Sequence, residues 1–155
     1  FVAHESYDAW MTRGIPLKGD VIFTTEAPLA NVCQLDTDEK VVFAQRIITL
    51  QPNREILTPA FLKYSLMSPQ MQSIILKQAT GATVSGIKAK LLKKVEVSFP
   101  PIEEQNTIIQ RVDSLFENLN QIEKTYQQEL DSYDELKQSI LQEAFYGKLT
   151  GGITA

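Results

Sequence analysis

The sequence predicts an α+β fold, in which a mixed domain with short antiparallel strands precedes one long coiled-coil helix at the C-terminal end. Three observations support this prediction. Short apolar runs separated by turn residues occupy residues 17–50, prolines precede two helical patterns between residues 59 and 80, and one apolar stripe with helical spacing runs from residue 101 to about residue 145. We expect residues 1–99 to form one domain, residues 100–147 the helix, and residues 148–155 a tail.

Strands are expected first in the domain. A Gly19-Asp20 turn leads into the apolar run 21–25, and two further runs, 31–35 and 41–50, flank the polar stretch 36–40. That stretch has the length and composition of a hairpin loop, so we predict that the second and third runs pair antiparallel.

Helices follow these strands. Pro59 and Pro69 suit the first positions of two consecutive helices, the second of which stops near Gly81. A flexible loop at residues 81–86 then leads into a short helical stretch containing Ile87, Leu91 and Leu92. Residues 95–99 alternate apolar and polar side chains, which predicts one more strand.

The last third of the chain reads as a single helix. Pro101 suits its first turn, Glu103 and Glu104 suit the positive end of its dipole, and Gly147 is a suitable C-terminal stop. Apolar residues alternate spacings of four and three, the seam of a left-handed coiled coil, until the step from Tyr126 to Leu130 repeats a four and shifts the register locally. The predicted helix-packing residues are Ile108, Val112, Leu115, Leu119, Ile122, Tyr126, Leu130, Tyr133, Leu136 and Ile140.

The length of this helix indicates a partner. About 45 residues at 1.5 Å each reach roughly 65 Å, whereas a domain of about 100 residues has a radius of gyration near 13 Å. We therefore expect most of the helix to project beyond the domain, and its seam to pack against a helix of another chain or segment. Self-association through the helix is the simplest form of such packing.

Charge is unevenly distributed along the chain. The formal net charge is −4, yet residues 40–95 contain nine basic and one acidic side chain, while residues 101–146 contain three basic and ten acidic ones. The whole-chain value therefore hides a strongly basic middle segment.

Catalytic and metal-binding patterns are not recognisable. His4 is the only histidine and Cys33 the only cysteine, so neither a zinc site nor a nucleophile-histidine pair assembles convincingly. Phosphate-binding glycine motifs are missing as well. We expect a non-enzymatic protein without a membrane span, located in the cytoplasm, in which the thiol of Cys33 is buried.

The basic segment suggests contact with nucleic acid. Lys88, Lys90 and Lys93 follow the glycine-containing loop, and no acidic residue occurs between Glu55 and Glu96. Phosphate contact and a merely solvated face of the turn 87–94 both fit this spacing. Glutamine suits adenine and arginine suits guanine, so Gln45 and Arg46 could read bases, or instead satisfy local structure. The predicted DNA-binding residues are Gln45, Arg46, Thr83, Ser85, Lys88, Lys90 and Lys93.

Several segments, taken in order, resemble the specificity subunit of type I restriction-modification systems. They are Leu17-Lys-Gly-Asp-Val-Ile-Phe-Thr-Thr-Glu-Ala, Gln45-Arg46, Pro59-Ala-Phe-Leu-Lys-Tyr-Ser-Leu-Met-Ser, Gly81-Ala-Thr, and Val97-Ser-Phe-Pro-Pro-Ile-Glu-Glu-Gln before a long helix that ends Ala144-Phe-Tyr-Gly-Lys-Leu. The resemblance covers nearly the whole chain, and the order of the segments makes it specific.

The resemblance implies a non-catalytic protein that binds double-stranded DNA. Residues 1–99 would be the later part of a target recognition domain, which reads one half of a split sequence, and residues 100–147 a spacer helix that packs antiparallel with another. Such a subunit docks methyltransferase subunits, and through them restriction subunits. No cofactor is expected on this chain, while S-adenosylmethionine, ATP and Mg²⁺ are expected on the partners.

Two further expectations follow from the same resemblance. The earlier part of a recognition domain has no counterpart in this sequence, so we expect the sequence to be a C-terminal fragment of such a subunit. The alternative hypothesis is a coiled-coil oligomerisation module that does not bind DNA, with the lysines simply solvated.

Overall fold

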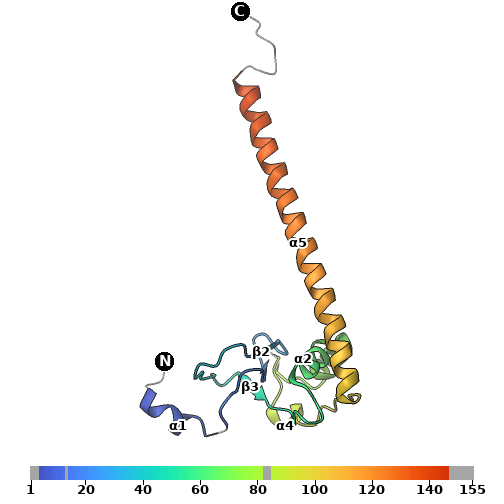
Figure 1. Ribbon diagram of the computed structural model, residues 1–155. Helices are drawn as coiled ribbons and strands as arrows, with labels where there is room; N and C mark the ends of the chain where they lie inside the picture. The colour runs from blue at the N-terminus through green and yellow to red at the C-terminus, as the bar shows by residue number, and fades with distance from the viewer. Residues whose placement is uncertain (1–3, 13, 82–84, 147–155) are drawn as a thin grey trace, which may run out of the picture. The chain divides into compact units, whose positions relative to one another are not determined.

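The computed structural model describes residues 4–12, 14–81 and 85–146, and it consists of two compact units, residues 1–110 and residues 111–155 (Figure 1). The first unit contains a small three-stranded sheet and several short helices, and the second is helical. The elements are η1 (His4–Ser6), α1 (Tyr7–Trp10), β1 (Val21–Thr24), β2 (Val32–Gln34), β3 (Ile47–Leu50), α2 (Pro59–Met67), α3 (Pro69–Lys77), α4 (Ala89–Leu92) and α5 (Ile102–Phe145). The predicted α+β class is confirmed.

The sheet has the order β2-β1-β3, with both outer strands antiparallel to β1. Phe23 of β1 lies opposite Val32 on one side and Ile48 on the other. The predicted pairing of the second and third strands is therefore wrong. Strand β1 is apolar and buried, with Val21 and Phe23 fully inaccessible, and pairing on both edges satisfies its backbone groups where water cannot reach them.

The turn before β1 is held by a buried carboxylate. Asp20 is 1% exposed and accepts hydrogen bonds from the backbone N–H of Leu17, from Nε2 of Gln51 and from Nη2 of Arg54, at 2.8, 2.6 and 2.8 Å. Burial alone raises the pKa of a carboxyl group, but these three donors together outweigh it, and the pKa of Asp20 lies below its usual range. The turn is thus anchored to the segment that follows β3.

Helices α2 and α3 begin as the sequence predicts. Thr58 and Ser68 are the N-caps, and their side-chain oxygens accept hydrogen bonds from the backbone N–H groups of residues 61 and 71. Pro59 and Pro69 open the helices, where their missing N–H groups have no helical partner to lose. The core that the helices cover contains Val21, Phe23, Ala30, Leu57, Leu62, Leu66, Ile75, Ile87 and Leu92.

Residues 95–99 form no strand, contrary to prediction. Val95 and Val97 pack against the core, whereas Glu96 and Ser98 are less buried and lie on the other side of the segment. The alternation of apolar and polar residues therefore reflects burial of one side of an irregular segment, which does not pair with the sheet.

Cys33 was expected to be buried, and it is exposed. It lies on the edge strand β2, where its neighbours Val32 and Gln34 are half-buried and its own side chain points away from the core. Over the parts of the chain that the structure describes, no helix combines the length and apolarity needed to cross a membrane.

Candidate nucleic-acid interface

Thr25 and Glu26, directly after β1, join two segments that lie far apart in the sequence. The backbone N–H and the Oγ1 hydroxyl of Thr25 donate to the carbonyl of Arg46, at 2.8 and 3.1 Å. On the other side, the carbonyl of Thr25 accepts from the N–H of Ile87 at 2.9 Å, and Glu26 forms an antiparallel bridge with Gly86. The residues around position 46 and those around position 86 thus meet at Thr25 and Glu26.

Gln45 and Arg46 lie in a turn, and the prediction that they belong to a strand is wrong. The N–H of Ile47 donates to the carbonyl of Ala44 at 3.2 Å, and β3 begins only at Ile47. Residues 41–46 belong to no strand because β1 is long enough to pair only with the end of that apolar run. Both side chains are exposed, which leaves their polar groups accessible to a ligand.

An ion pair joins the turn to the segment after β1. Nε of Arg46 lies 2.8 Å from Oε1 of Glu26, and the two side chains are 65% and 38% exposed. The arginine is therefore held at one nitrogen while most of its surface faces solvent. The sequence did not single out Glu26, because its partner is 20 residues away and Glu26 is one of seven acidic side chains in residues 1–39, which contain only two basic ones.

The loop after α3 approaches the same segment closely. Thr80 and Gly86 exchange two backbone hydrogen bonds, of 2.8 and 3.0 Å, which close the loop. A Cβ atom on Gly86 would lie 3.2 Å from both the Cβ of Glu26 and the carbonyl oxygen of Thr25. A side chain at this position would therefore push the two bridged segments apart. Ser85 is exposed beside this contact, and Thr83 lies outside the described residues.

The three predicted lysines surround α4. Lys88 is the residue before the helix, Lys90 lies within it, and Lys93 follows it; all three are exposed. Ile87 and Leu92, in contrast, are 4% and 8% exposed and belong to the core. Because the aliphatic side chains of this short segment are buried, its lysine side chains face solvent. Arg46 thus contacts Thr25 and Glu26, and Ser85 precedes Gly86, which forms the bridge with Glu26. Lys88 lies two residues beyond Gly86, and no described contact links Lys90 or Lys93 to Arg46.

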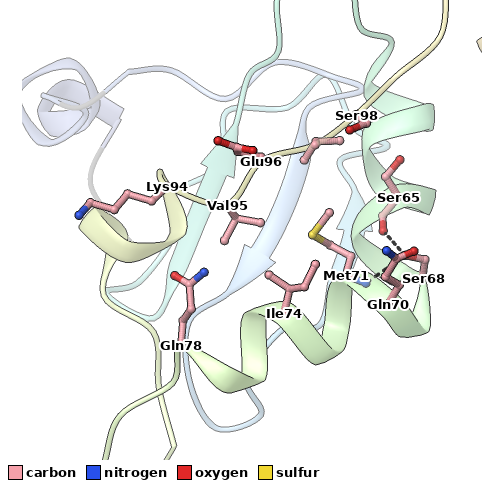
Figure 2. Close-up of a pocket in the computed structure, with 11 residues that line it drawn as sticks. Ser65, Ser68, Gln70, Met71, Ile74, Gln78, Lys94, Val95, Glu96 and Ser98 are labelled. Carbon is pink, nitrogen blue, oxygen red and sulfur yellow. Dashed lines mark hydrogen bonds between the residues drawn. The ribbon is translucent and has the colours of Figure 1, made fainter.

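A separate hollow of about 590 Å³ lies between α3 and the irregular segment 94–98 (Figure 2). Met71 and Ile74 of α3 face Val95 across it, and hydroxyl and amide groups from Ser65, Ser68, Gln70 and Gln78 lie around its rim. Within residues 4–12, 14–81 and 85–146, no group of three or more His, Cys, Asp or Glu side chains is placed to hold a metal ion.

Helix α5 carries the predicted seam on its surface. The exposed fractions of the seam residues run from 36% for Ile108 to 68% for Tyr133, and Val112 is half-buried. Glu129 follows Tyr126 by three residues and precedes Tyr133 by four, so it occupies the position that an uninterrupted alternation of four and three assigns to the seam. The apolar stripe along α5 is thus interrupted once, by the carboxylate of Glu129.

The first turns of α5 belong to the first unit through Gln105, which is fully buried. Its Oε1 accepts from the N–H and Oγ1 of Thr58, at 2.9 and 3.3 Å, and its Nε2 donates to the carbonyls of Ile56 and Pro100, at 2.8 and 2.7 Å. All four hydrogen-bonding capacities of the amide are satisfied.

Comparison with known proteins gives consistent results. Residues 12–132 match the family model of the type I restriction modification DNA specificity domain. The chain is 33% identical over 133 residues to the type I restriction enzyme EcoBI specificity subunit of Escherichia coli, an alignment covering 86% of this chain and 28% of that protein. It is 30% identical over 139 residues to the EcoKI specificity subunit of Escherichia coli strain K12, covering 85% of this chain and 30% of that protein.

Two solved structures share the fold. A chain from a study of complex assembly and conformational transition of the type I R-M system has a TM-score of 0.70 at 22% identity, over 86% of this chain and 32% of that one. The S subunit of a type I restriction-modification system from M. genitalium has a TM-score of 0.53 at 23% identity, over 67% of this chain and 27% of that one. The present chain thus spans less than a third of the length of these relatives.

Proposed function

The chain belongs to the family of type I restriction modification DNA specificity domains, and on that premise we propose that its first unit contacts double-stranded DNA as part of a specificity subunit. One observation carries this proposal: Thr25 and Glu26 join the turn bearing Gln45 and Arg46 to the loop that leads into Lys88. A glutamine, an arginine, a serine and a lysine, all exposed, are the side chains that hydrogen-bond to bases and phosphates.

Roles within this surface follow from chemistry. Gln45 and Arg46 carry the groups that pair with adenine and guanine edges in the major groove. Lys88, Lys90 and Lys93, with Thr83 and Ser85 in the preceding loop, supply cations and hydroxyls for phosphates. The exposed lysines would thus position the subunit, and the turn would select the sequence.

The long helix is proposed to assemble the complex. Its seam, from Ile108 to Ile140, would pack against a second helix as a spacer, and its ten acidic residues suit contact with protein subunits better than contact with phosphates. A reach of roughly 65 Å would separate two half-sites by about one to two DNA turns of some 34 Å each. Methyltransferase subunits, and restriction subunits through them, would carry the catalysis.

The alternative of an oligomerisation module without DNA binding is not favoured. The family model that matches residues 12–132 is that of a DNA specificity domain, and its match includes the whole of the proposed surface. Packing through the helix remains part of the proposal for the complete subunit.

A salt titration tests the proposed DNA contact. The complete specificity subunit, with its methyltransferase subunits, is titrated against duplex DNA by fluorescence anisotropy at several salt concentrations. Replacing Lys88, Lys90 and Lys93 by Ala should weaken binding and flatten the dependence of log K on log salt by about 0.9 for every phosphate that a lysine no longer neutralises. The matched control replaces Lys18, Lys40 and Lys77, which are exposed elsewhere on the first unit. Equal effects of the two triple variants would remove the α4 lysines from the DNA surface.

A further inference from the structure

A carboxylate lies at the centre of the proposed DNA-contacting surface. Glu26 is 38% exposed, its backbone forms the bridge with Gly86, and its Oε1 lies 2.8 Å from Nε of Arg46. The other charged residues assigned to this surface, Arg46, Lys88, Lys90 and Lys93, are all basic. An anion here repels phosphates and lowers affinity for every DNA sequence alike. Generic DNA affinity therefore does not account for it.

Folding stability does not account for this pair either. Exposed ion pairs contribute little to stability, since solvent screens them and ordering two long side chains costs entropy. The backbone of Thr25 is already held by Arg46 and Ile87 through hydrogen bonds that do not involve the carboxylate of Glu26. The carboxylate can therefore act on Arg46 without being needed to hold the backbone.

We propose, building on the function proposed above, that Glu26 is a positioning residue that fixes the Arg46 guanidinium for a guanine and restrains it from binding phosphates indiscriminately. A guanidinium held at Nε still presents its two Nη groups in one plane, the geometry that pairs with O6 and N7 of guanine. Because the side chain is already oriented, less rotamer freedom is lost when the target binds.

The same pair discriminates against other DNA. A phosphate that approaches Arg46 away from the target must compete with Glu26 for the guanidinium and also meets the carboxylate's own negative charge. A guanine edge is uncharged and meets no such repulsion. Glu26 therefore lowers non-specific binding more than target binding, which is a gain in specificity rather than in affinity.

The test compares target and non-target duplexes, using the complete subunit with its methyltransferase subunits. Glu26→Gln keeps the size of the side chain and removes its charge. We expect non-target affinity to rise about threefold or more, as removal of one exposed charge interaction permits. The non-target salt slope should steepen by about 0.9, and the ratio of target to non-target affinity should fall. The matched control is Asp38→Asn, which removes the carboxylate of another exposed ion pair, formed by Lys18 and Asp38 at 2.9 Å. This control should leave the ratio of target to non-target affinity unchanged.

A double-mutant cycle separates positioning from other roles. In an Arg46→Ala background, Glu26→Gln should no longer change the affinity ratio, because the residue it acts on is gone. Glu26→Asp retains the charge and should recover part of the ratio. If Glu26→Gln lowers the ratio equally with and without Arg46, Glu26 contacts DNA directly and the positioning role is wrong.

The cycle also distinguishes failure of this inference from failure of the proposed function. An unchanged ratio in Glu26→Gln, with a lowered ratio in Arg46→Ala, overturns the inference and leaves Arg46 as a base-reading residue. An unchanged ratio in Arg46→Ala overturns both the inference and the base-reading role of Arg46, while the titration of the Lys88, Lys90 and Lys93 variant decides separately whether the first unit contacts DNA.

Discussion

The side-chain carbonyl of Gln105, in the first turns of α5, accepts a hydrogen bond of 2.9 Å from the backbone N–H of Thr58, 47 residues earlier in the chain. Thr58 is also the N-cap of α2, so one buried amide ties the start of α5 to the start of another helix. The start of the long helix is therefore held by specific polar contacts.

Replacing Gln105 by Ala should destabilise the first unit by about 2–4 kcal/mol, because the N–H of Thr58 and the carbonyls of Ile56 and Pro100 would lose their partner in a buried place. Urea unfolding followed by circular dichroism measures the change. Gln110→Ala, at an exposed position of the same helix, is the control and should have almost no effect. Equal stability of the two variants would show that the Gln105 hydrogen bonds contribute nothing.

Asp20→Asn should cost about 2–3 kcal/mol at pH 7, because the charged acceptor of three hydrogen bonds is removed. The pKa of Asp20 is lowered on folding, so its contribution is present above the ordinary aspartate value of about 3.9 and is lost as the pH falls through the lower folded value. The stability gap between wild type and Asp20→Asn should therefore narrow in acid. A gap that stays constant from pH 7 to pH 2 would contradict this, and Asp38→Asn serves as the exposed control.

Gly86→Val should disturb the proposed DNA surface, because even a Cβ would meet Glu26 and the carbonyl of Thr25 at 3.2 Å. A cost of about 1–3 kcal/mol in stability is expected from such crowding, together with weaker target binding. Ser85→Ala, on the neighbouring exposed residue, should leave stability unchanged. Thermal unfolding and DNA titration of both variants provide the comparison, and unchanged behaviour of Gly86→Val would mean that the bridge adapts freely.

Glu129→Leu should strengthen helix association, since it completes the apolar seam and removes a charge from it. Sedimentation should show a dissociation constant lowered by roughly tenfold or more, as burial of one leucine permits. Gln128→Leu adds the same side chain one position away, outside the seam, and is the matched control. If both variants associate equally well, the stripe of α5 does not determine the packing.

Local signals predicted several elements correctly. The prolines that open α2 and α3 and the extent of α5 depend on residues within one or two turns of each other, which is the range over which sequence patterns act. Residues 113–145 of α5 are all exposed, so the choice of Leu119 and Tyr133 as seam residues stays a prediction.

Tertiary pairing was not predictable in the same way. The polar stretch 36–40 resembles a hairpin loop, yet β2 and β3 each pair with β1, and only competition for the apolar central strand decides between these arrangements. Arg46 lies in a turn because β1 pairs only with residues 47–50. Its ion pair with Glu26 joins two residues that are 20 positions apart, and nothing in the sequence indicates that they meet. The candidate site was thus predicted as a set of residue types, while its centre at Thr25 and Glu26 required the structure.

Sequencing of methylated bases tests the central claim most directly, that the surface around Thr25 and Glu26 reads the DNA sequence. The genome of a strain carrying the complete gene with Arg46→Ala is compared with that of the same strain carrying the wild-type gene. Without one bidentate arginine–guanine pair, one position of one half-site should relax from guanine to several bases, and the other half-site should stay unchanged. An identical methylated sequence at undiminished occupancy would contradict the account.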